Sequence, residues 1–199
     1  MKREYIPIVI MGSLGVVLIG VGYYFRKQLK EVTRAAINYF NDNINSHLNQ
    51  LNPIVRQKFA DFITKIQKMG YYVQINSSYR TFERQNQIKN NPKDSSYDPS
   101  AATPGYSLHN YGLAADLQVS KNGKIYGKTT SDAEWLSTGI PQLAKSMGMI
   151  WGGDAFKDYQ DAVHFGYQLK DNAQLLAMAQ KQFGTTDPNK IIGNKLNIA

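Results

Sequence analysis

The spacing of hydrophobic positions divides the chain into helical and extended segments. Four segments have apolar residues three or four positions apart, as amphipathic helices do: residues 26–50, 53–69, 132–147 (with a break at 139–141) and 172–183. The pair Asn52-Pro53 marks the start of the second helix, because proline is tolerated at a first helical position. Gly70 marks its end. A shorter helix is expected to follow Thr81 and to run through Ile88.

Short runs of alternating or β-branched apolar residues predict the strands. These runs are residues 71–76, 113–119, 149–151 and 163–165, with a hairpin punctuated by Gly123 and Gly127. Residues 90–105 are rich in Pro, Ser, Asn and Asp, so we expect a surface loop there. Helices flanking a small, mostly antiparallel sheet make the predicted fold class α+β.

Residues 6–25 run for twenty positions without a charge, and this stretch predicts a transmembrane helix. Twenty residues in a helix rise about 30 Å, which matches the thickness of a bilayer core. A cleavable signal peptide would have a shorter apolar region followed by small residues, and no such cleavage site follows here. We therefore expect an anchor at 1–26, a helical stalk or first packing helix at 27–50, a globular domain at 51–184 and a C-terminal tail at 185–199, which is expected to be loosely ordered.

Composition narrows the partners and the possible metal ligands. The net charge of +8 favours polyanions such as anionic lipids or the acidic polymers of a bacterial envelope. We expect no nucleic-acid binding, because no stripe of Lys and Arg interleaved with stacking aromatics is present. The chain has no cysteine, so any metal must take nitrogen and oxygen donors.

Two segments, residues 107–116 and 161–165, hold two of the three histidines and the candidate metal ligands. His109, Asp116 and His164 supply the three protein ligands of a catalytic zinc site, which keeps one position open. His109 and Asp116 would lie more than about 20 Å apart on a straight strand, so the chain must turn back between them. Each residue alone also has an ordinary structural reading, and His47, among polar neighbours, is interpreted as a solvated surface histidine.

Other residues near these segments are candidates for catalysis and substrate binding. Asp161 is the candidate general base. Its three-residue step to His164 places it in a bend before the strand, since on an ideal strand the two would face opposite sides. Arg80 could bind a substrate carboxylate or stabilise an oxyanion, with a surface salt bridge as the alternative. Ser78 and Ser107 could bind substrate or be turn residues, and Trp151 is expected at the lip of the cleft.

These residues resemble the motifs of the zinc D-Ala-D-Ala carboxypeptidase and L-alanyl-D-glutamate endopeptidase family. The family includes VanY-type carboxypeptidases and phage endolysins, and it shares its fold with the hedgehog signalling domain. The resemblance covers roughly residues 51–167 and rests on these positions: Ser107, His109, Gly112, Ala114, Asp116, Asp161 and His164, with segments 77–81 and 151–153. It implies zinc held by His109, Asp116 and His164, with Asp161 as catalytic base and Arg80 as a substrate and transition-state contact.

The expected function is that of a membrane-anchored zinc peptidase acting on the stem peptides of peptidoglycan. Carboxypeptidase members typically carry Glu at the base position, so Asp161 favours an L-Ala-D-Glu cut and leaves D-Ala-D-Ala as the alternative. The expected location is a single-pass membrane protein of a bacterium or a phage virion, used for wall remodelling, infection or lysis. Basic residues are denser after the span, which by the positive-inside rule conflicts with a domain facing the wall. The alternative from another class is a non-catalytic membrane or virion protein that only binds peptidoglycan.

Overall fold

The computed structural model describes residues 28, 30–31, 34–35, 38–156 and 160–198, and it divides the chain into two compact units. The first unit is Met1–Asn41, whose described residues are helical. The second is Asp42–Ala199, which holds all the elements named below. The predicted transmembrane segment at 6–25 lies outside the described residues. Among those residues, no helix is both long and apolar enough to cross a bilayer.

The described part of the second unit is built on one antiparallel sheet, as the alternating segments predicted. Its strands are β1 (Tyr72–Ser77), β2 (Ala114–Lys121), β3 (Lys124–Tyr126), β4 (Ile150–Trp151) and β5 (His164–Gly166). They run in the order β1-β2-β5-β4, and β3 pairs with the far end of β2. Every pairing is antiparallel. The central strand β2 pairs with β1 along one edge and with β5 and β3 along the other.

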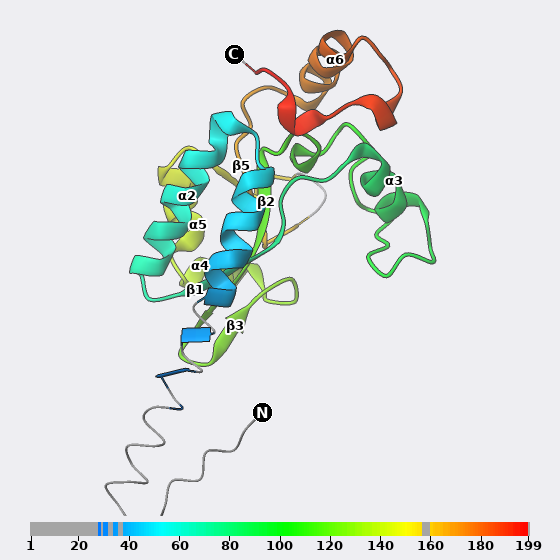
Figure 1. The fold of residues 1–199 in the computed structure, drawn as a ribbon. Helices are drawn as coiled ribbons and strands as arrows, with labels where there is room; N and C mark the ends of the chain where they lie inside the picture. The colour runs from blue at the N-terminus through cyan, green and yellow to red at the C-terminus, as the bar shows by residue number, and fades with distance from the viewer. Residues whose placement is uncertain (1–27, 29, 32–33, 36–37, 157–159, 199) are drawn as a thin grey trace, which may run out of the picture. The chain divides into compact units, whose positions relative to one another are not determined.

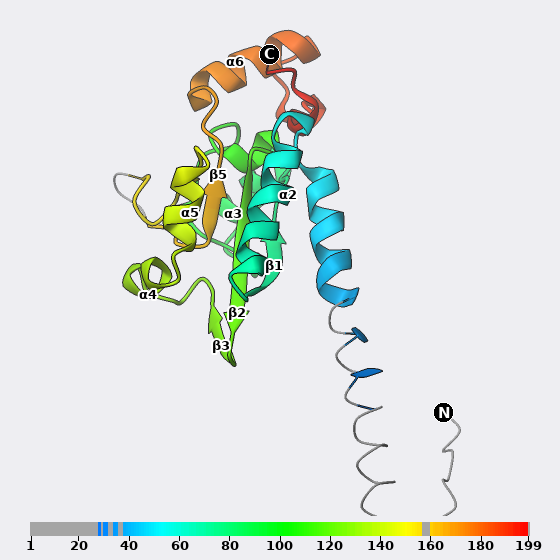
Figure 2. The same ribbon diagram turned by 90° about the vertical axis from the view of Figure 1, so that its left-hand side faces the viewer.

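The helices follow the predicted pattern closely. They are α2 (Pro53–Lys68), α3 (Phe82–Asn90), α4 (Asp132–Ser137), α5 (Ile140–Ser146) and α6 (Asn172–Phe183), with 3-10 turns η1 (Leu108–Tyr111), η2 (Pro188–Lys190) and η3 (Gly193–Lys195). Residues 42–50 are also helical. The predicted break between α4 and α5 falls at Gly139, whose backbone is left-handed with φ 75°. Figures 1 and 2 show α2 and α5 on one face of the sheet and α3 on the other.

The core lies between the sheet and α2, α4 and α5, and it is centred on Phe165 of β5. The Phe165 ring is fully buried and contacts Phe62 of α2 at 5.4 Å and Trp135 of α4 at 5.8 Å between ring centroids. Side chains alternate along a strand, so the neighbouring His164 points to the opposite face of the sheet. The packing of Phe165 therefore also sets the direction of His164.

The C-terminal segment packs against the domain, and the expectation of a loosely ordered tail is wrong. Ile191, Leu196 and Ile198 are buried. The buried side-chain amide of Asn52 donates to the Leu196 carbonyl at 2.9 Å, and Asn194 donates to the Gln50 carbonyl at 2.8 Å. The apolar residues of this segment have no regular period, because they pack as an irregular strap with two 3-10 turns, and a periodicity argument does not detect such a strap.

Gly112 ends η1 and is the point where the chain turns back from His109 toward Asp116. Its backbone is left-handed with φ 65°, and its carbonyl accepts a hydrogen bond from the Asn52 backbone amide at 3.0 Å. A Cβ at this position would lie 2.7 Å from the Asn52 amide nitrogen and 2.9 Å from the Asn194 Cβ. Gly112 therefore meets two requirements, a positive φ and a close backbone approach, that only glycine fulfils.

We predict that Gly112→Ala lowers the free energy of unfolding by about 3 kcal/mol. Left-handed backbone costs a non-glycine residue about 1–2 kcal/mol, and overpacking adds about 1–3 kcal/mol. Gly123→Ala is the matched control, because Gly123 has φ 78° and an added methyl group there would have nothing within 4 Å, so only the backbone cost of about 1–2 kcal/mol applies. Urea unfolding monitored by circular dichroism measures both. Equal losses in the two variants would contradict the close approach at Gly112.

Candidate metal centre

The pairing of β2 with β5 brings two of the predicted ligands together. Asp116 and His164 are direct partners across these antiparallel strands, so their side chains leave the same face of the sheet. Their neighbours in the next register position, Ala115 and Phe165, point into the core on the other face. Asp116 and His164 therefore project away from the core, toward the face that α3 covers.

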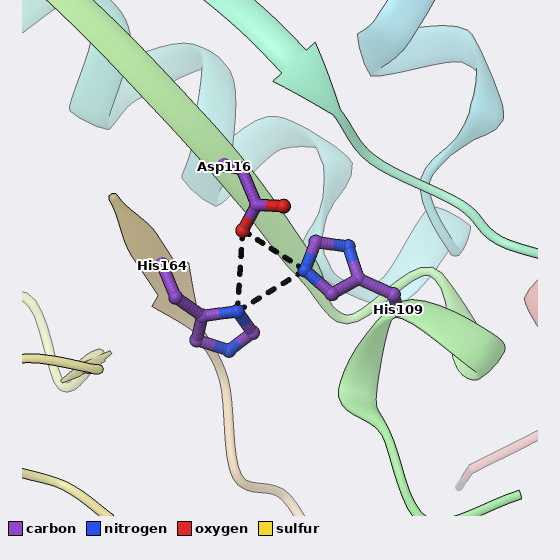
Figure 3. A group of neighbouring side chains, drawn as sticks. All are labelled: His109, Asp116 and His164. Carbon is purple, nitrogen blue, oxygen red and sulfur yellow. Dashed lines mark hydrogen bonds and ion pairs between the residues drawn. The ribbon is translucent and has the colours of Figure 1, made fainter. Parts of the chain in front are cut away.

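His109 lies in η1, seven residues before Asp116, and its side chain reaches the same point. Its imidazole is 3 % exposed, and its Nδ1 lies 2.6 Å from the Ser78 carbonyl oxygen. Because a carbonyl can only accept, Nδ1 carries the proton and donates it to Ser78. The other ring nitrogen, Nε2, faces Asp116 and His164 (Figure 3), and in the neutral ring this nitrogen carries the lone pair that a metal ligand needs.

The three donor atoms have the spacing of a metal site. His109 Nε2 lies 3.0 Å from Asp116 Oδ1 and 3.1 Å from His164 Nδ1, and the latter two atoms are 3.3 Å apart. Zinc–ligand bonds of about 2.0–2.1 Å in a tetrahedron place neighbouring donors about 3.3 Å apart. Two imidazoles and one carboxylate are donors that zinc accepts, and the geometry leaves room for a fourth ligand. The residues present therefore fit a zinc ion.

Asp116 is ionised in this setting, as a metal ligand must be. Burial alone would raise its pKa, but the charges and hydrogen bonds of His109 and His164 hold the pKa of Asp116 well below its ordinary range. Its second oxygen, Oδ2, lies 3.5 Å from Nη2 of Arg80. The carboxylate thus faces the two imidazoles with one oxygen and a guanidinium with the other.

Asp161 lies outside the strand, in the bend that the three-residue step to His164 requires. Its backbone amide donates to the Gly152 carbonyl at 2.9 Å, and its carbonyl accepts from the His164 amide at 2.9 Å. Burial and the nearby charge of Asp116 raise the pKa of Asp161, although His164, His109 and Lys128 oppose the shift. Its carboxyl therefore takes up a proton more readily than an exposed aspartate does, while Asp116 resists protonation.

Arg80 is held beside the site by hydrogen bonds to its guanidinium group. Nη1 donates to Gln85 Oε1 at 2.9 Å, and Nη2 donates to Ser77 Oγ at 3.2 Å. The Arg80 side chain is 17 % exposed and lines the same cleft as Asp116 and Asp161. It is thus a fixed, partly buried cation next to the metal ligands and not a mobile surface salt bridge.

A cleft of about 740 Å³ contains the site and extends past it toward α3 and the loop after it. Ser78 and Ser107, predicted as substrate contacts, both line this cleft, although the Ser78 side chain is buried. Trp151 does not line it. Its indole is 1 % exposed and donates to the Ala162 carbonyl at 2.8 Å, which makes it part of the core beside β5 and not a lip of the cleft.

Sequence reasoning missed several residues that line this cleft. His47, interpreted as a solvated surface histidine, is half-buried there, and burial lowers its pKa. Gln50 and Lys128 also line the cleft, and so does Phe156, whose ring centroid lies 5.3 Å from that of the His164 imidazole, with the two rings tilted by 59°. Only His47 had a signal in the sequence, because it lies one turn after the buried Ile44 and next to Leu48, on the edge of an apolar stripe.

Comparison with known proteins places these residues in a family. The family model described as VanY, D-alanyl-D-alanine carboxypeptidase, matches residues 48–168. The peptidoglycan L-alanyl-D-glutamate endopeptidase CwlK of Bacillus subtilis is 32% identical over 121 residues, which cover 56% of this chain and 71% of that protein.

Two solved structures also resemble the chain. The L-Ala D-Glu endopeptidase ChiX of Serratia marcescens is 16% identical, with a TM-score of 0.39 over 63% of this chain and 86% of that one. A vancomycin-resistance D,D-pentapeptidase VanY in complex with Zn(II) is 20% identical, with a TM-score of 0.43 over 59% and 72%. Because the family model spans more than half of the sequence, including all three candidate metal ligands, the chain belongs to the VanY D-alanyl-D-alanine carboxypeptidase family.

Proposed function

We propose that this chain is a zinc-dependent peptidase that cleaves peptide bonds of peptidoglycan. The observation that carries the proposal is the triad His109, Asp116 and His164, whose donor atoms have the spacing of a tetrahedral site. Asp161 and Arg80 line the same cleft, so an acid–base group and a cation lie beside the triad. The relative CwlK is named as a peptidoglycan endopeptidase, which supports the substrate class.

The residues divide the chemistry between them. When bound, zinc polarises the scissile carbonyl and lowers the pKa of water toward neutrality. Asp161 takes the proton from the attacking water and delivers it to the leaving amine, which its raised pKa suits. Arg80 binds a substrate carboxylate or the oxygen that becomes negative at the scissile carbonyl, because its guanidinium is already fixed at the cleft wall.

The bond that we propose is the L-Ala-D-Glu linkage of the stem peptide. Two observations favour it: the base position holds Asp161 and not Glu, and the curated relative at 32% identity is named for this activity. The second candidate is the D-Ala-D-Ala bond, which the description of the matching family model favours.

We further propose that residues 6–25 anchor the enzyme in a membrane with the domain on the side of the cell wall. The twenty uncharged residues support the anchor. Peptidoglycan lies outside the cytoplasmic membrane, and this location of the substrate supports the orientation. The basic residues that follow the span favour the opposite orientation by the positive-inside rule.

We predict that Asp161→Asn and His109→Ala separate catalysis from metal binding. Asp161→Asn keeps one zinc per chain but lowers muropeptide cleavage by about 10²–10⁴-fold, because the proton acceptor is lost and the ligands are intact. His109→Ala loses both the zinc and the cleavage. Metal analysis and turnover of the full chain, purified in mild detergent, measure the two properties. The control is Asp154→Asn, an exposed aspartate paired with Lys145 outside the cleft, which keeps both. Retained cleavage in Asp161→Asn would remove Asp161 from the mechanism and favour another base.

Mass spectrometry of digested muropeptides that carry the full pentapeptide identifies the bond. An L-Ala-D-Glu cut leaves the disaccharide with a single L-Ala and releases a peptide that begins with D-Glu. A D-Ala-D-Ala cut releases only one alanine, so the two products differ clearly in mass. We expect the first product set, with Asp161→Asn as the blank. Release of alanine alone would establish the second candidate, and an uncleaved but bound substrate would support the non-catalytic alternative.

The membrane proposal predicts that the full chain stays with membranes at alkaline pH and that a variant lacking residues 6–25 is released. Because the chain has no cysteine, the single variant Ser95→Cys, at an exposed position in the loop after α3, reports orientation. A membrane-impermeant maleimide should label it in intact cells with a permeabilised outer envelope. Labelling only after lysis would show that the domain faces the cytoplasm.

A further inference from the structure

His47 connects the helix formed by residues 42–50 to the metal centre. It lines the catalytic cleft, and its Nδ1 lies 2.9 Å from Oγ of Ser78, a residue 31 positions later in the chain. Ser78 is 1 % exposed and follows the end of β1. The contact is therefore a long-range hydrogen bond to a buried hydroxyl group.

The direction of this hydrogen bond follows from the partners of Ser78. The Ser78 hydroxyl donates its single proton to Oε1 of Gln50 at 3.3 Å. It must then accept from His47, so Nδ1 of His47 carries a proton and donates it. Two side chains of one helix thus hold the Ser78 hydroxyl from two directions.

The same serine holds a metal ligand through its main chain. The Ser78 carbonyl accepts from Nδ1 of His109 at 2.6 Å, which leaves Nε2 of His109 facing Asp116 and His164. Partners of this kind fix the tautomer and the ring orientation of a metal-binding histidine. A displacement of Ser78 would therefore turn the His109 ring away from the ion.

We propose that His47 is a positioning residue of the metal centre, which acts on His109 through Ser78. Taking the ion as zinc rests on the proposed function. His47 immediately precedes residues 48–168, the part that the family model matches, so the role falls outside the matched sequence. The helix of residues 42–50 thereby becomes part of the active site and not only a support for the sheet.

Asn43 provides a matched comparison, because it makes a similar contact one helical turn earlier. Its side chain accepts from the Ile75 amide at 2.8 Å and donates to the Ile75 carbonyl at 3.0 Å. Asn43 thus attaches the same helix to β1 at Ile75 and not at Ser78. Loss of Asn43 removes a structural attachment, whereas loss of His47 removes the attachment that reaches His109.

The experiment compares His47→Ala, His47→Asn and Asn43→Ala in the full chain, with the zinc dissociation constant measured by competition with a chelator. His47→Ala should weaken zinc binding about tenfold or more, the effect typical of losing an outer partner of a metal ligand. His47→Asn should restore binding to within about threefold, because its amide N–H replaces the imidazole N–H. Asn43→Ala should lower the Tm and leave the zinc dissociation constant within about twofold.

The outcomes separate this proposal from the proposed function. Unchanged zinc affinity in His47→Ala, or an equal loss in Asn43→Ala, overturns the positioning role and makes His47 an ordinary structural contact. A wild-type chain that binds zinc but cleaves no muropeptide overturns the proposed function and leaves the effect of His47 measurable. A wild-type chain that binds no zinc overturns both. Circular dichroism of each variant confirms that the affinities compare folded chains.

Discussion

The antiparallel pairing of β2 with β5 is the interaction on which the metal centre depends. It places Asp116 directly opposite His164, and the same register places Phe165 opposite Ala115 on the other face. A slip of β5 by one residue would turn His164 into the core and bring Phe165 to the cleft, while Asp116 stays on the face that the pairing of β2 with β1 and β3 sets. The contacts of Phe165 with Phe62 and Trp135 oppose such a slip, so hydrophobic packing on one face keeps the ligands together on the other.

The same register explains why two nearby aspartates behave differently. Asp116 lies on the strand, between the imidazoles of His109 and His164, and these lower its pKa. Asp161 lies before the strand, half-buried and close to the negative charge of Asp116, and its pKa is raised. Opposite shifts in neighbouring carboxyl groups are the usual sign of a division between a ligand or stabiliser and an acid–base group.

Local patterns were enough to predict the helices, the strands and the ligand triad. The helix of residues 172–183, predicted from its apolar spacing, matches α6 to the residue, and the structure shows Asp171 capping its start and Gly184 its end. The bend at Asp161 followed from the period of a strand. The contact of His47 with Ser78, the burial of Trp151 and the packing of the C-terminal segment were not predictable in this way, because each depends on partners outside the local sequence. Ser78, for example, lies 31 positions after His47, and no pattern in the sequence around either residue indicates that the two side chains form a hydrogen bond.

The metal centre is assembled entirely from contacts between distant segments, and this has an energetic consequence. His109 contacts Ser78 across 31 positions and His164 across 55 positions, so the donor set does not exist in the unfolded chain. Zinc binding to the folded state alone stabilises that state by RT ln(1 + [L]/Kd), about 2.7 kcal/mol at a hundredfold excess over Kd. Any residue that orients the ligands therefore contributes more to stability when the ion is present than when it is absent. This dependence distinguishes an orienting residue such as His47 from a structural contact such as Asn43, whose contribution is the same with and without the ion.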